Sequence, residues 1–163
     1  MQFRDKEYYK ASLERMRQAD QIWSQEDAFA LAMYCGGLAV ECMLRAFRWQ
    51  FDKTFEGRHD LVDLFRASRV LQSHEDYLRQ RGHDDQHIFE LTLKFKADMN
   101  EVVTLLHNNF RFATEARIKT YLTKIQRVQG IKGDPLKKIS RDLIDATQTV
   151  INKGIVLWES QKK

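Results

Sequence analysis

The stretch that most constrains this chain is residues 28–51, where almost every face of a helix would carry an apolar residue. A helix that is apolar all round is normally buried. At 1.5 Å of rise per residue, a helix over residues 25–51 would be roughly 40 Å long, enough for the central helix of a small domain. Ser24, a good N-cap residue, precedes the acids Glu26 and Asp27 and predicts where this helix begins.

The rest of the chain also has a helical pattern. It holds one proline and seven glycines, and no alternating β-branched run is bounded by turn residues. A length of 163 residues suits one domain. We therefore expect an all-α fold, an up-and-down bundle of about five to six helices, with residues 1–163 as a single domain. The periodicity predicts helices at residues 4–23, 25–51, 60–68 and 86–108, from Thr114 onward, and at about 135–160.

Two details refine this expectation. Gly36 and Gly37 lie inside the central helix, where each glycine costs about 1 kcal/mol relative to alanine. We therefore expect another helix backbone to approach closely at that point. Residues 69–86 form a polar connector, in which Ser73 could cap a short helix up to Arg81.

The positive charge is concentrated in the last third of the chain. Residues 1–110 hold 15 Lys and Arg against 18 Asp and Glu, whereas residues 111–163 hold 12 against 5, and together they give the net charge of +4. A basic surface of this kind favours an acidic partner such as nucleic acid. A solvated helix face rich in lysine is the alternative, since overall charge alone identifies no partner.

The sequence predicts no cofactor, no metal and no membrane contact. Cys35 and Cys42 would lie about 10 Å apart along one helix, which is too far for a disulfide bond. We therefore interpret both as buried thiols. The N-terminus lacks the apolar core of a signal peptide, and the apolar run over residues 28–40 is too short to cross a bilayer. We therefore expect a cytoplasmic protein. The set of His83, Asp84, Asp85 and His87 fits no metal-ligand spacing.

Three motifs follow one another in a recognisable order. The central helix carries GLAVECML, with Glu41 as its one buried acid; residues 57–61 read GRHDL; and residues 109–112 read NFRF. This order resembles the HEPN superfamily (higher eukaryotes and prokaryotes nucleotide-binding domains) over roughly residues 4–125. The chain differs in the arginine before His59 and in the phenylalanine after Arg111, where tyrosine is common.

The resemblance implies a helical bundle that is often a homodimer. Many HEPN relatives are metal-independent ribonucleases of toxin–antitoxin or defence systems, and others bind nucleotides or act as non-catalytic scaffolds. The catalytic relatives share an arginine and a histidine with four to six residues between them, which suits a charge-stabilising group and a general base. No histidine follows Arg111 at that distance. The spacing occurs instead at Arg69–His74 and at Arg81–His87.

The candidate ligand-binding residues come from different parts of the chain. An arginine can hold a phosphate, and an asparagine can hydrogen-bond a base or a ribose. A buried acid also needs a partner, which we expect to be the His59 region or Arg111. The candidate ligand-binding set is Glu41, His59, Asn108, Asn109 and Arg111, and the candidate catalytic residues are His59, Arg111, His74 and Arg69.

Three functions remain open from the sequence. The missing Arg–His spacing favours a HEPN-like protein that binds RNA or a nucleotide without catalysis. The second is a metal-independent ribonuclease with a displaced pair, either Arg111 with His59 or Arg69 with His74. The third is a non-catalytic partner of a nucleotidyltransferase, which an exposed apolar patch over residues 49–55 would favour.

Overall fold

The computed structural model describes residues 3–25, 28–53, 60–106 and 108–161, and these residues form helices and no strand. The predicted all-α class is confirmed. The helices are α1 (Asp5–Gln25), α2 (Phe29–Trp49), α3 (Leu61–Ser68), α4 (Val70–Gln80), α5 (Asp85–Leu105), the 3-10 helix η1 (Asn108–Phe112), α6 (Glu115–Lys124) and α7 (Pro135–Ser160).

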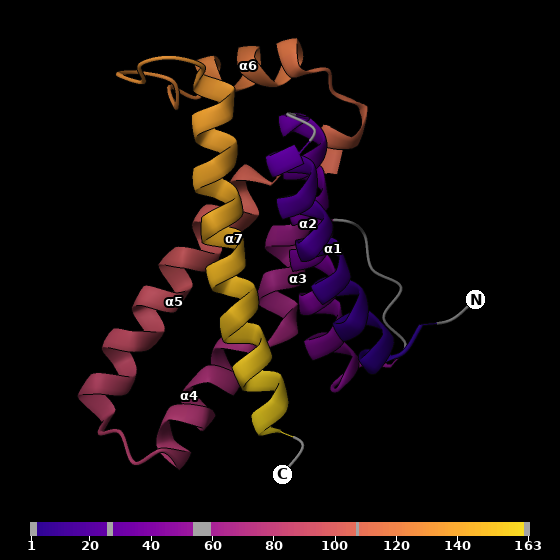
Figure 1. Ribbon diagram of the computed structural model, residues 1–163. Coiled ribbons are helices and arrows are strands. Elements are labelled where there is room, and N and C mark those ends of the chain that lie inside the picture. Colours follow the sequence, from indigo (N-terminus) through magenta and orange to yellow (C-terminus); the bar gives the residue numbers. More distant parts are fainter. Residues whose placement is uncertain (1–2, 26–27, 54–59, 107, 162–163) are drawn as a thin grey trace.

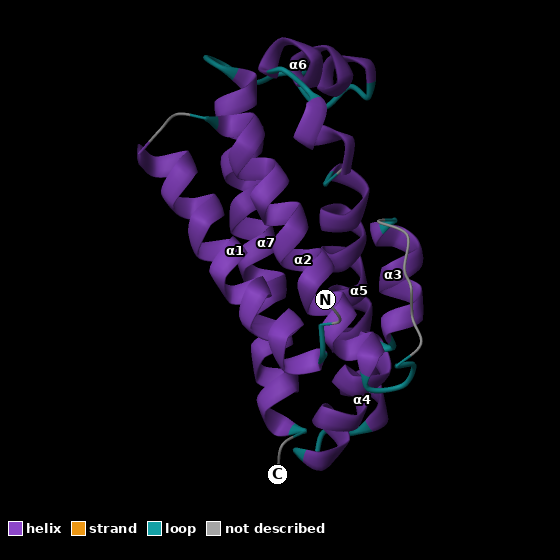
Figure 2. Cartoon of the chain, turned by 90° about the vertical axis from the view of Figure 1, so that its right-hand side faces the viewer, coloured by secondary structure: helices purple, strands orange, loops and turns teal. Residues whose placement is uncertain are grey.

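Helix α2 is the central element, as its apolar pattern predicts. It packs against α1, α3, α6, α7 and η1, and α1, α2 and α7 run side by side along the bundle (Figures 1 and 2). Helix α5 packs on α3, α4 and α7. The short α6 lies across one end of the bundle, next to the start of α7 (Figure 1).

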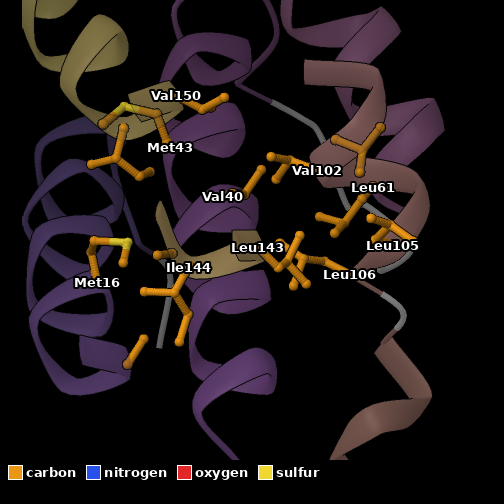
Figure 3. Packing of buried hydrophobic residues seen from close by; sticks show 14 of the residues in the cluster. Met16, Val40, Met43, Leu61, Val102, Leu105, Leu106, Leu143, Ile144 and Val150 are labelled. Carbon is orange, nitrogen blue, oxygen red and sulfur yellow. The ribbon is translucent and has the colours of Figure 1, made fainter. Parts of the chain in front are cut away.

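The core draws apolar side chains from nearly every helix. Figure 3 shows Met16 of α1, Met43 of α2, Val102 of α5 and Ile144 of α7 converging on one cluster. Burial of each such side chain is worth roughly 1.5–3 kcal/mol. By length and composition α2 could span a membrane, but 72% of its most apolar window is buried inside the bundle.

The predicted start of the central helix was wrong. Helix α1 continues to Gln25, and the Ser24 hydroxyl donates back to the carbonyl of Asp20 at 2.8 Å rather than capping the next helix. A serine inside a helix commonly makes this bond to the preceding turn. Helix α2 begins only at Phe29, after Ala28, which makes no side-chain cap hydrogen bond.

Gly36 and Gly37 lie inside helix α2 and do not interrupt it. The sequence predicted that another helix backbone would approach closely here, but side chains are the nearest neighbours. A Cβ on Gly36 would lie 3.8 Å from Thr147 Cγ2, and one on Gly37 would lie 3.6 Å from Leu106 Cβ. Both are ordinary contacts with side chains. The tight position is Gly154 on α7, where a Cβ would come within 2.9 Å of Met43 Cγ.

Several helix starts agree with the sequence. Thr114 is the N-cap of α6, and its hydroxyl accepts a hydrogen bond from the Arg117 amide. Asp134 is the N-cap of α7, and its carboxylate accepts one from the Leu136 amide; Pro135 is the first residue of that helix. The polar connector does hold a short helix, α4, but the predicted cap at Ser73 was wrong. Helix α4 already starts at Val70, and Ser73 is buried inside it, because Arg69 takes a left-handed conformation with φ of 56° between α3 and α4.

Candidate functional site

Glu41 is buried on α2, as predicted, and a basic residue of its own helix binds it. The Arg45 Nε donates to Glu41 Oε1 at 2.8 Å, and both side chains are buried. The Arg45 guanidinium lies 5.9 Å from the centre of the Tyr8 ring on α1. A buried carboxylate needs such a partner. This arrangement makes Glu41 part of the α1–α2 packing.

The Arg69–His74 pair does not form a site with a basic histidine. Arg69 is exposed, and its guanidinium lies 5.0 Å from the ring centre of Phe51. His74 is only 9% exposed, its Nδ1 lies 3.3 Å from Thr92 Oγ1, and its ring packs 4.9 Å from that of Phe95. Burial, with a smaller contribution from Lys153, lowers the pKa of His74 to about 4. At neutral pH His74 is therefore an uncharged core residue.

The second spacing match lies on the surface. Arg81 packs over Tyr77, and the rings of His83 and His87 lie 4.9 Å apart at the exposed start of α5. Asp84 is the N-cap residue there, accepting a hydrogen bond from the His87 amide at 2.9 Å. No group of three or more His, Cys, Asp or Glu side chains is placed to hold a metal ion within the described ranges.

The predicted NFRF motif falls in a distinct element, the 3-10 helix η1 between α5 and α6. Asn108, Asn109 and Arg111 therefore belong to one short segment. His59 lies outside the described residues, so its predicted place beside Glu41 and Arg111 stays a prediction. Asn109 is exposed, and it lines a cavity that η1 forms with α6.

This cavity has a volume of about 360 Å³, within the usual range of small-ligand pockets. Its apolar base comes from buried residues, since Phe110 and Ile118 both belong to the core. The Phe110 ring meets that of Tyr121 edge-on at 6.2 Å. The lining is Asn109, Phe110, Phe112, Ala113, Arg117, Ile118 and Tyr121.

The polar and aromatic groups of this cavity suit a flat, charged ligand. Phe112 is 76% exposed, so much of its ring is accessible to solvent. Tyr121 also lines the cavity and is half-buried, and Arg117 is exposed on the first turns of α6. An aromatic ring can stack on a base, an arginine can bind a phosphate, and an amide can bind a base edge.

The segment that contributes the cavity, from the end of η1 to the first turns of α7, is rich in basic residues. Residues 111–141 carry nine Lys and Arg against two Asp and Glu, a net charge of +7. Some of these cations are paired, such as Lys119 with Asp134 at 3.3 Å. Arg117, Lys124 and Lys132 make no ion pair with any described residue. The positive charge of this segment is therefore only partly neutralised.

The candidate ligand-binding residues predicted from the sequence include residues of η1 but none of α6. Arg117 and Tyr121 are four residues apart, so both lie on one face of that helix. An arginine and an aromatic residue at this spacing, inside the most basic segment of the chain, were a readable signal. Ile118 and Leu122 mark the buried side of α6, but they do not by themselves show that the exposed side borders a cavity.

Comparison with family models, curated proteins and solved structures gave no match to this chain. The HEPN-like order of motifs is therefore a resemblance carried by the sequence, and the helical bundle agrees with it only at the level of fold class.

Proposed function

We propose that this protein binds RNA or a nucleotide in the cavity between η1 and α6. The observation that carries the proposal is the combination, in one cavity, of an exposed aromatic ring at Phe112 with Arg117 and Asn109, inside a segment of net charge +7. The HEPN-like motifs, which include the NFRF sequence of η1, support the same class of ligand.

The aromatic rings supply the sequence-independent part of binding. Every base has a flat π-face, and stacking on an aromatic side chain is worth about 1–3 kcal/mol per base. Phe112 is the most exposed large apolar side chain among the described residues. Burying it under a base would remove apolar surface from water as well as provide the stacking contact.

The basic residues around the cavity supply the attraction for phosphates. Cations that bind phosphates release counterions from the nucleic acid, so binding weakens as the salt concentration rises. Arg117 lines the cavity, and Lys124 lies further along the same helix. Arg117 and Phe112 line the same cavity, so one nucleotide could place its phosphate on the arginine and its base on the ring.

The proposal is one of binding rather than catalysis. His74, the histidine of one displaced pair, is a buried neutral residue in contact with Phe95 and Thr92. The pair of Arg111 with His59 stays a prediction, as does a ribonuclease that would use it. A nucleotidyltransferase partner and a toxin–antitoxin or defence role likewise stay predictions of the sequence resemblance.

The direct test is equilibrium binding of a fluorescent single-stranded RNA, measured by anisotropy in EDTA over a series of salt concentrations. We expect Phe112→Ala to weaken binding roughly 5- to 150-fold, the loss of one stacked base. Arg117→Gln should reduce the slope of log K against log salt by about 0.7. Phe3→Ala, an exposed phenylalanine at the start of α1, and Arg66→Gln, an exposed arginine on α3, are the matched controls.

Each outcome has a distinct meaning. Equal losses in the Phe112 and Phe3 variants would refute the cavity as the site. RNA cleavage in EDTA that disappears in His59→Ala and Arg111→Ala variants would instead establish the ribonuclease. An absence of both binding and cleavage would refute the proposal and leave the nucleotidyltransferase partner, which a co-purification experiment would then test.

A further inference from the structure

A second cavity lies between the start of α1 and the end of α2. Its volume is about 560 Å³, larger than that of the cavity between η1 and α6 and within the usual range of small-ligand pockets. The lining is Arg4, Asp5, Trp49, Gln50 and Lys53. The two cavities share no lining residue, and the first turn of α1 lies well away from α6 (Figure 1). They are therefore separate sites.

Three of the lining residues are charged. Arg4 and Lys53 supply two positive charges and are exposed, and Asp5 supplies one negative charge and is half-buried. Although the three side chains line one cavity, none of them forms an ion pair with a described residue. Both signs of charge are therefore available to a ligand in this cavity.

Trp49 provides the aromatic surface of the lining. It is the last residue of α2 and is half-buried. An indole ring offers a large flat apolar face, on which another ring can stack. The other lining residues are polar, so a purely apolar ligand would leave charged groups without a partner. The lining suits a molecule that carries both a ring and charges.

We propose that this cavity binds a small zwitterion with a flat ring, which is the chemistry of a free aromatic amino acid. The ligand carboxylate lies on Arg4 and Lys53, because an arginine can bind a carboxylate through two parallel N–H groups. The ligand ammonium lies on Asp5, and its ring lies on Trp49. The Gln50 amide adds a neutral donor and acceptor.

A ligand with a single sign of charge fits this lining less well. An anion such as a phosphate would meet the Asp5 carboxylate, and a simple cation would meet Arg4 and Lys53. The helix ends agree with the side chains. Asp5 begins α1 and Trp49 ends α2, so the positive end of one helix dipole and the negative end of another both border the cavity.

The test is isothermal titration calorimetry of the full chain with L-phenylalanine, with tryptophan fluorescence as a second readout. We expect a Kd of about 1 mM, which is typical of so small a ligand. Two comparison ligands each lack one charge. 3-Phenylpropionate has no ammonium and 2-phenylethylamine has no carboxylate, and each should bind roughly tenfold more weakly than L-phenylalanine.

Two variants assign the charges to their residues. Asp5→Asn should weaken L-phenylalanine binding roughly tenfold without weakening 3-phenylpropionate binding, because only the amino acid has an ammonium. Arg4→Gln should weaken the binding of both carboxylates without weakening that of 2-phenylethylamine. The matched controls are Asp85→Asn, an exposed acid in the first turn of α5, and Arg66→Gln, an exposed arginine of α3. Both controls should bind L-phenylalanine like the wild type.

Several results would overturn the proposal. These are an absence of L-phenylalanine binding in the millimolar range, a comparison ligand that binds as tightly as the amino acid, or equal effects of Asp5→Asn and Asp85→Asn. The proposal is independent of RNA binding, since the cavity between η1 and α6 contains none of these residues. Asp5→Asn should therefore leave RNA affinity unchanged.

Discussion

We expect this protein to lose stability as the pH falls from 6.5 towards 4, because His74 must stay neutral inside the fold. Its pKa is lowered from 6.5 to about 4, chiefly by burial and further by the nearby charge of Lys153. The unfolded chain therefore binds a proton at this histidine before the folded chain does. Protonation in this window favours the unfolded state, so the contribution is fully present above pH 6.5 and is lost as the pH falls through the folded pKa.

The magnitude follows from the size of the shift. Each unit of pKa difference corresponds to about 1.36 kcal/mol, so the difference between 6.5 and about 4 is worth about 3 kcal/mol between neutral pH and pH 4. A change of this size is a large share of the total stability of a domain, which is typically about 5–15 kcal/mol. It should therefore be measurable by denaturant unfolding.

The assay is urea unfolding followed by circular dichroism at 222 nm, repeated at intervals between pH 4 and pH 7.5. The test variant is His74→Phe, which keeps a ring against Phe95 but does not titrate. We expect the free energy of unfolding of the variant to depend less on pH than that of the wild type, by about 3 kcal/mol over the interval. Leu31→Phe, at an exposed non-titrating position of α2, is the control, and it should keep the pH dependence of the wild type. Parallel pH profiles for wild type and His74→Phe would refute the burial argument.

Three further predictions concern α2 and its neighbours. Gly154→Ala should destabilise the fold by about 1–3 kcal/mol, because its Cβ meets the buried Met43 side chain. Gly36→Ala should leave stability unchanged or raise it by up to about 1 kcal/mol in the same denaturation assay, since its Cβ has room. Burial raises the pKa of the Cys42 thiol to about 11. We therefore expect Cys42 and the buried Cys35 to react slowly with a thiol reagent at pH 8 in the native protein and rapidly in urea, and fast reaction of the native protein would contradict this.

Helices were predictable where a side chain of the segment itself fixes an end. Pro135 and its cap Asp134 set the start of α7 from local chemistry alone, and Thr114 did the same for α6. Ser24 looked equally suitable, but its hydroxyl bonds backwards to Asp20. The choice between capping forwards and bonding backwards depends on whether the helix continues, and packing of α1 against α2 and α7 decides that.

The roles of the candidate site residues were harder to predict, because each role depends on neighbours that are distant in the sequence. From the sequence we predicted that the buried Glu41 carboxylate needs a hydrogen-bond partner. We did not predict Arg45, which lies four residues later on the same helix and donates to it. The spacing of His74 from Arg69 suits catalysis, whereas its contacts with Thr92 and Phe95 of α5 make it a core residue, and the charge of Lys153 on α7 further lowers its pKa. Only the placement of these helices shows the difference.

The arrangement of the fold separates stability from the proposed binding. The core that α2 organises holds Phe47 and Met43, whereas Phe112 is largely exposed on a short 3-10 helix at the end of the bundle. Removing an exposed ring costs little folding energy, because little surface was buried there. Phe112→Ala should therefore lower RNA affinity without lowering the urea midpoint. A variant that loses both in parallel would show that Phe112 serves the packing of η1, and the binding argument would then need a different residue.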